Sequence, residues 1–185
     1  KHGDRAGIAS NLADVQVTNS FFQGATRNAC GYNQSGVKFD NCIFSTDLGM
    51  SEADGGEGGD WNWYDHCSFY AGTNLRDQLT GATNNKFTNS ILTTLDIKGS
   101  SSITSDSNYN LFVNNIQDGA TSRDLASWRT ANSSDANSVQ GAPTYVGSDF
   151  DTIAAYALDT GSAGENSSSI GTDIGADVTT IGVLA

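Results

Sequence analysis

Basic residues are scarce in this chain. Lys and Arg together number nine among 185 residues, against 21 Asp and Glu, and the formal net charge is −12. No basic stripe is present, which argues against nucleic acid as a partner, because phosphate binding requires clustered Lys and Arg. The same deficit disfavours attraction to an anionic membrane surface. A strongly anionic polysaccharide would also be repelled unless a bound cation or a local Arg intervened.

Long apolar runs are absent as well. The sequence contains no stretch of the ~18 apolar residues that a transmembrane helix requires. No signal peptide is visible, and the chain begins with Lys1 instead of Met, so we expect a mature product or a fragment of a longer protein. The apolar residues are phased and include many aromatics, which argues against disorder, and the length fits one domain.

Cysteine is also rare, and three cysteines do not make a disulfide framework. Cys42 and Cys67 occupy the same position of two consecutive repeats. On adjacent strands they would lie ~4.8 Å apart, which suits either stacked buried thiols or a disulfide. Packed thiols are the favoured interpretation, because buried Cys behaves as a small hydrophobe. Cys30 has no evident partner.

A short polar-then-apolar phrase recurs along the first two-thirds of the chain. Its anchor residues are spaced by 22, 25, 23 and 21 positions. A phrase at this period is typical of a solenoid in which each turn adds one strand to a parallel sheet. The anchors should align as a structural ladder of stacked amides, with a row of ligand-binding amides as the alternative. The anchors are Asn19, Asn41, His66, Asn89 and Asn110.

His66 is the exception in this ladder, and it is either a tolerated substitution or a catalytic base. The apolar residues that follow each anchor should stack in the core, and shorter second strands are expected at 29–30, 48–50, 74–75 and 95–97. Residues 1–113 are therefore assigned to the repeats. Residues 114–185 are assigned to a C-terminal capping segment of the same domain, with a short helix over 122–131 capped by Ser122.

The third repeat carries an acidic, Gly-rich insertion over 51–60, followed directly by an aromatic cluster. Insertions in solenoids form loops on one side, which is often the binding face. Ring faces stack on sugar C–H groups while carboxylates accept hydroxyl protons, so the glycan-binding candidates are Trp61, Trp63, Tyr64 and Asp60. The loop also offers carboxylate oxygens, which calcium prefers as ligands, and this weakly supports a calcium site formed by Asp54, Glu57 and Asp60. The alternative is a solvated loop without a bound ion.

The repeats together with the C-terminal phrases resemble the right-handed parallel β-helix superfamily, the pectate-lyase-like group. The resemblance covers roughly residues 15 to 177, and it implies an all-β fold, a short right-handed parallel β-helix of about five rungs with a C-terminal cap. It does not define the activity, because this fold hosts lyases, hydrolases, adhesins and tailspikes. The phrases that carry it are 105–112, 125–128, 135–139, 141–146 and 173–176.

Lyases of this group commonly use a strand-borne Arg or Lys as the base and acidic residues that hold calcium. The basic candidates match no such motif, and we expect Lys38 and Lys86 to share an outward position on the sheet. Carboxylates for glycoside hydrolysis are available, but their separation in space decides that chemistry. No catalytic residue is therefore assigned. The basic candidates are Lys38, Arg76, Lys86 and Lys98, and the acidic ones are Asp54, Glu57, Asp60, Asp65 and Asp77.

The leading hypothesis for function is an extracellular or virion-surface attachment module of the tailspike, fibre or decoration-protein type. Such a module would contact a polysaccharide or surface glycan, or neighbouring subunits, with a homotrimer as one arrangement. The alternative is a secreted polysaccharide lyase or glycoside hydrolase, or a C-terminal fragment of one. A purely structural stalk is a third option. No cofactor is expected apart from calcium.

Overall fold

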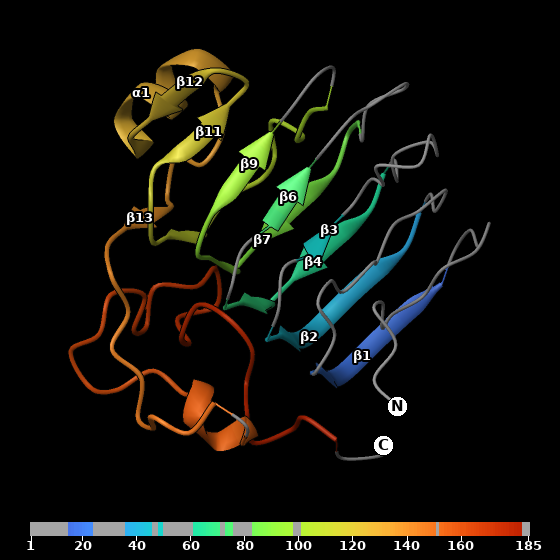
Figure 1. Ribbon diagram of the computed structural model, residues 1–185, viewed down its shortest axis with the longest axis vertical. Helices are drawn as coiled ribbons and strands as arrows, with labels where there is room; N and C mark the ends of the chain where they lie inside the picture. Colours follow the sequence, from blue (N-terminus) through green and yellow to red (C-terminus); the bar gives the residue numbers. More distant parts are fainter. Residues whose placement is uncertain are drawn as a thin grey trace.

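The computed structural model is built mostly of β-strands (Figure 1). It contains one eight-residue α-helix, α1 (Leu125–Asn132), and a short 3-10 helix, η1 (Ile153–Tyr156), within the part described. In that part, no helix has the length and apolar character needed to cross a bilayer. The described residues are 15–23, 36–45, 48–49, 61–70, 73–75, 83–97, 101–150 and 152–182.

The larger sheet is curled and has only parallel pairings. Each repeat contributes to it, because strands about 22 to 25 residues apart in sequence pair in register, as Thr18 does with Asp40 and Asp40 with Asp65. Its strands are β1 (Gln16–Phe22), β2 (Lys38–Phe44), β4 (Trp63–Asp65), β5 (Ser68–Phe69), β7 (Lys86–Thr88), β8 (Ile91–Leu92), β10 (Leu111–Phe112) and β13 (Val139–Gln140).

The second sheet has five strands in the order β12-β11-β9-β6-β3. All its pairings are parallel except β11 with β12. The second strands predicted near residues 48, 74 and 95 are therefore confirmed, whereas the one predicted at 29–30 lies outside the described residues. The strands are β3 (Leu48–Gly49), β6 (Thr73–Leu75), β9 (Leu95–Ile97), β11 (Ile116–Asp118) and β12 (Thr121–Arg123).

A left-handed residue bends each strand of the larger sheet. Asn19, Asn41, His66 and Asn89 have φ between 47° and 54°, a region that Asn and His enter more readily than most residues. The register places these four residues side by side, and Asn41 Nδ2 donates to Asn19 Oδ1 at 2.8 Å. We call these four residues the ladder.

Asn110 is one position out of register with this ladder. Strand β10 places Leu111 beside Ile91, so Asn110 lies beside Ser90, and Tyr109 takes the left-handed position with φ of 57°. The buried Asn110 amide instead donates to Asp135 Oδ1 at 2.9 Å. The fifth ladder member was therefore misplaced by one residue, because the spacing of 21 is shorter than the others and the phrase is looser there.

Stacked aromatic rings fill the core between the two sheets. Phe44 lies between Phe22 and Phe69; in both pairs the ring centroids are 4.8 Å apart and the ring planes are nearly parallel. Tyr64 stacks in the same way between Phe39 and Phe87, at 5.1 and 5.0 Å. In-register strands bring like side chains together at about one strand spacing, which is the distance at which offset rings attract.

Cys42 and Cys67 are buried free thiols in adjacent positions. Each S–H donates to the backbone carbonyl two residues earlier, at Asp40 (3.4 Å) and Asp65 (3.3 Å). Burial is the main cause that raises the pKa of the Cys67 thiol. The interpretation as packed thiols is confirmed for this pair, and Cys30 lies outside the described residues.

Helix α1 closes one end of the core with Leu125 and Trp128. Its N-cap is Asp124, whose Oδ1 accepts from the Ser127 amide at 2.8 Å. The predicted cap, Ser122, lies instead in β12. The helix begins later than predicted because a carboxylate accepts this bond as well as a hydroxyl does.

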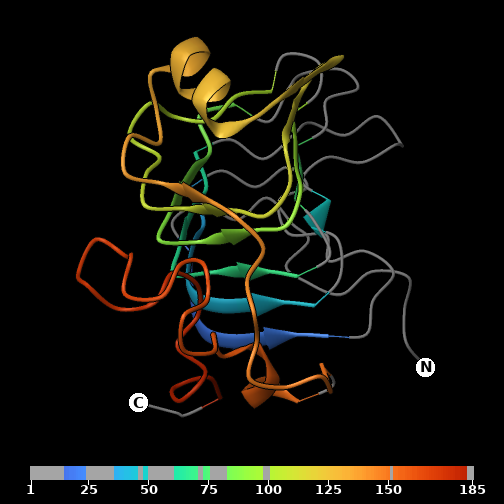
Figure 2. The ribbon, with the colours of Figure 1, turned by 90° about the vertical axis from the view of Figure 1, so that its left-hand side faces the viewer.

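The chain then returns along the outer face of the larger sheet, where the orange and red segment lies against the strands in both views (Figure 1, Figure 2). We call residues 166–182 the strap. The strap reaches β1, since the Gly182 amide donates to Asn19 O at 2.8 Å. The apolar residues after the ladder therefore divide between two layers. Phe22, Phe44, Phe69, Leu92 and Phe112 face the core, whereas Phe21, Ile43, Ile91 and Leu111 lie under the C-terminal segment.

We predict that Phe44→Ala lowers the free energy of unfolding by about 3–5 kcal/mol, because it empties the centre of the aromatic stack. Ile170→Ala is the control, since Ile170 is 72% exposed and should change stability by less than about 0.5 kcal/mol. Urea unfolding followed by fluorescence measures both. Equal, small effects of the two substitutions would contradict the stack as a main source of stability.

Candidate functional site

Two rows of side chains project from the outer face of the larger sheet, just before the ladder. The first row contains Lys38, Trp63 and Lys86, which are neighbours by strand register. The second contains Asp40, Asp65 and Thr88. Both rows face outward because they alternate with the buried core residues of the same strands. The predicted shared outward position of Lys38 and Lys86 is thereby confirmed.

Trp63 lies between the two lysines of its row. Lys38 Nζ is 4.3 Å and Lys86 Nζ 4.7 Å from a ring centroid of the indole, which suits a cation–π interaction with each. Both ammonium groups also have carboxylate partners, at 3.0 Å in Asp40 and 2.6 Å in Asp106. The Trp63 ring is therefore occupied by neighbouring side chains and is not an open plane for a sugar.

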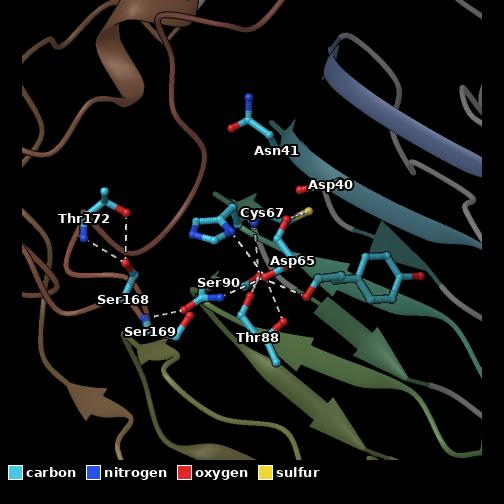
Figure 3. A network of polar contacts seen from close by, with 12 residues as sticks. Asp40, Asn41, Asp65, Cys67, Thr88, Ser90, Ser168, Ser169 and Thr172 are labelled. Carbon is cyan, nitrogen blue, oxygen red and sulfur yellow. Dashed lines mark hydrogen bonds and ion pairs between the residues drawn. The ribbon is translucent and has the colours of Figure 1, made fainter.

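Asp65 is at the centre of a polar network (Figure 3). Its Oδ1 accepts from Thr88 Oγ1 and from Asn89 Nδ2, both at 2.9 Å, and lies 3.2 Å from His66 Nδ1. Trp63 Nε1 donates to Thr88 Oγ1 at 2.7 Å. Since an indole N–H can only donate, the Thr88 hydroxyl must point its own proton at Asp65.

These contacts determine the charge of Asp65. Burial by itself raises the pKa of this carboxyl, but the hydrogen bonds from His66, Asn89 and Thr88 outweigh burial and lower the pKa from 3.8 to about 2. Asp65 is consequently ionised at every physiological pH. It can orient or attract a positive partner, but it cannot supply a proton as a general acid.

The ionised Asp65 also determines the orientation of His66. With Nδ1–H directed at Asp65 Oδ1, the neutral ring carries its lone pair on Nε2. This Nε2 is buried and has no hydrogen-bond partner. An imidazole held by a carboxylate in this way is a hydrogen-bond acceptor, a general base or a metal ligand.

One carboxylate oxygen each of Asp40 and Asp65 and one ring nitrogen of His66 lie within 4.8 Å of one another. Three such atoms resemble part of a metal site. However, Lys38 Nζ lies 3.0 Å from Asp40 Oδ2 and 4.0 Å from Asp65 Oδ2. The chain thus supplies its own cation between the two carboxylates, and a metal ion would have to displace it.

A groove of about 640 Å³ runs beside this cluster, between the ladder and the strap. Asn19, Asp40, Asn41 and His66 line one side, and residues 170–180 line much of the other. The volume is in the range of ordinary ligand sites, ~300–1,000 Å³. The groove therefore brings together His66 with strap residues more than 100 positions away in sequence.

The ladder amides anchor the strap on both sides of His66. Asn89 Oδ1 accepts from the Ser169 amide at 2.7 Å, and Asn41 Nδ2 donates to Thr180 Oγ1 at 2.7 Å. Gly175 permits this close approach, because a Cβ there would lie 2.7 Å from the side chains of Ile91 and Ser68. His66 lies between Asn41 and Asn89 in the ladder. Its Nε2 has no hydrogen-bond partner, so the His66 side chain, unlike those of its two neighbours, makes no hydrogen bond to the strap.

The glycan candidates predicted from the sequence are dispersed. Trp61 is 64% exposed at the start of its strand, and Tyr64 is fully buried in the aromatic stack, which removes it from any glycan contact. Asp60 and the predicted calcium ligands Asp54 and Glu57 lie outside the described residues, so this site stays a prediction. Sequence reasoning missed the groove, although an Asp directly before the ladder residue in two successive repeats, 40–41 and 65–66, was a visible signal.

Comparison of the chain with protein-family models, with curated proteins and with solved structures found no match. The functional argument therefore depends on the geometry of the site.

We predict a specific pH dependence for Asp65. Because its pKa is lower in the folded chain than its ordinary value of 3.8, its stabilisation is fully present above pH 4 and is lost as the pH falls through about 2. Its side chain is 17% exposed, so we expect about 1–2 kcal/mol. Asp65→Asn should therefore cost stability at pH 6 and little at pH 2, measured by urea unfolding. An NMR carboxyl midpoint at or above 4 would contradict this.

Proposed function

We propose that the chain is a short right-handed parallel β-helix of about five turns that binds a glycan in the groove beside His66. The β-helix is supported by the in-register parallel pairing of successive repeats and by the alternation of the chain between two sheets. The handedness follows the strong preference of parallel crossovers for the right-handed form. Residues 114–185 complete the same domain as cap and strap.

The observation that carries the binding proposal is the groove itself, which the ladder lines on one side and the strap on the other, with the carboxylates of Asp40, Asp173 and Asp177 in its wall. Sugar hydroxyls need fixed partners, and Asp40 and Asp177 offer carboxylate oxygens from the two sides of the groove. Apolar side chains such as Leu158, Ile170 and Val178 line the groove as well, and they suit the C–H faces of a pyranose ring. This mixture of apolar walls and a few polar groups is typical of sites for small ligands and sugars.

The setting we propose is an extracellular or virion-surface attachment module, comparable to a tailspike, fibre or decoration protein. The acidic charge and the many small polar residues support this setting, because they favour solubility without attraction to nucleic acid. Neighbouring subunits, including a homotrimer, remain part of the proposal as partners.

A second candidate is hydrolysis of the bound glycan, and the Asp65–His66 pair favours it. An imidazole oriented by a carboxylate can act as a general base on water once an opening of the groove wall exposes its buried Nε2. A two-carboxylate mechanism is less well supported, because Asp65 stays ionised and cannot act as the general acid, and Asp40 is paired with Lys38 at 3.0 Å. Release of reducing ends from a bound glycan would distinguish cleavage from attachment.

We predict that His66→Asn weakens glycan binding by about tenfold, which corresponds to about 1.4 kcal/mol, because it replaces the imidazole ring of the groove wall with a smaller side chain. Asn keeps the left-handed turn that this position requires. Binding is measured on an array of neutral, amino and uronate glycans and then by calorimetry with the retained oligosaccharide.

Two variants serve as controls for this measurement. Val146→Ala, at a 64% exposed position outside the groove lining, should bind as the unmodified chain does. Trp61→Ala tests the platform predicted from the sequence, five residues before His66. If binding is lost in Trp61→Ala and kept in His66→Asn, the glycan site lies at the aromatic cluster and the groove proposal is wrong.

A further inference from the structure

We infer that the groove selects glycans that carry hydrogen-bond donors and no anionic group, that is, neutral or amino glycans instead of polyuronides or sulfated chains. This inference rests on the proposed function, since it specifies the ligand class of the same groove. Three observations carry it: the charges that line the groove, the direction of its hydrogen-bonding groups and the engagement of the nearby lysines.

The charged residues of the groove wall are acidic. Asp40 lines the ladder side, and Asp173 and Asp177 line the strap side. Among the described residues that form the wall, none is Lys or Arg. A carboxylate or sulfate on the ligand would therefore enter a partly enclosed space that already holds like charges, where solvent screens repulsion less than on an open surface.

The hydrogen-bonding groups of the wall are mainly acceptors. Three of its residues, Asp40, Asp173 and Asp177, contribute carboxylate oxygens. Asp173 and Asp177 are each held through Oδ1, by the amides of Asn166 and Thr179, and a carboxylate has a second oxygen that can only accept. A ligand that satisfies such a wall must donate, as hydroxyl and ammonium groups do.

The donors near the groove are engaged within the chain. Asn41 Nδ2 donates to Asn19 Oδ1 and to Thr180 Oγ1. The two lysines of the outer face are paired with Asp40 and Asp106 and lie against Trp63. An anionic sugar would have to break one of these ion pairs to gain a cationic partner, whereas a neutral or amino sugar would not.

The experiment compares oligosaccharides that share a backbone and differ in one substituent. Each neutral hexamer (glucan, mannan or galactan) is paired with its C6-carboxylate form, and the β-1,4-glucan is also paired with its C2-amino form. Calorimetry at 50 mM and 500 mM salt gives the affinities. We expect the neutral or amino form to bind at least tenfold more tightly than the matched uronate at low salt, and we expect this ratio to shrink at high salt.

Two variants that each remove one negative charge, one inside and one outside the groove, test whether the groove causes the preference for uncharged over anionic glycans. Asp173→Asn keeps the Oδ1 acceptor and removes one charge from the wall, so it should raise uronate affinity several-fold. Asp124→Asn removes the same charge at the N-cap of α1, where Asn caps equally well, and should leave the ratio unchanged. If Asp173→Asn does not fold, the salt dependence of the unmodified chain still tests the inference.

The outcomes separate this inference from the proposed function. A uronate that binds as tightly as its neutral partner, with binding lost in His66→Asn, overturns the ligand class and leaves the glycan site in place. Binding of no hexamer and no array glycan overturns the proposed function and this inference with it.

Discussion

The architecture depends on one backbone constraint, the left-handed residue that bends each strand of the larger sheet. A strand ordinarily sends alternate side chains to opposite faces. The bend at Asn41 interrupts this alternation, so Phe44 enters the core while Ile43 faces outward and must be covered. Because the bend recurs at the same register in neighbouring strands, the outward apolar residues line up in a stripe, and the C-terminal segment is the element that buries it.

The ladder residues have two functions in this arrangement. Their positive φ makes the bend, and the side chains of Asn41 and Asn89 hold the strap through hydrogen bonds to its backbone and hydroxyl groups. His66 makes the same bend but directs Nδ1 inward to Asp65 and leaves Nε2 unpartnered. A buried polar atom without a partner is costly, and the ring that carries it is one of the side chains that line the groove.

The periodic part of the fold could be predicted from the sequence, and the part that depends on distant contacts could not. The repeat spacing located β1, β2, β6 and β9, because each rung packs against its neighbours with the same local pattern. The strap bonds to the ladder across 80 to 163 positions with no repeated sequence pattern. Tyr64 was assigned to a surface cluster because the alternation of side chains along a strand defines two faces of the sheet without showing which face is buried. Asp40, Asp65 and His66 were visible as residues, but their convergence required the register.

The electrostatics of the cluster favour recognition over acid catalysis. Three donors converge on one oxygen of Asp65 and keep it ionised despite burial, so its negative charge is a fixed property of the site. That charge orients His66, and together with Asp40 it retains Lys38 between the two carboxylates. Lys38 therefore balances one of the two negative charges and occupies the space in which a metal ion would bind. What this cluster presents to the groove is the carboxylate of Asp40 and the ring of His66, and the proposed preference for ligands with hydroxyl or amino groups depends on that negative charge.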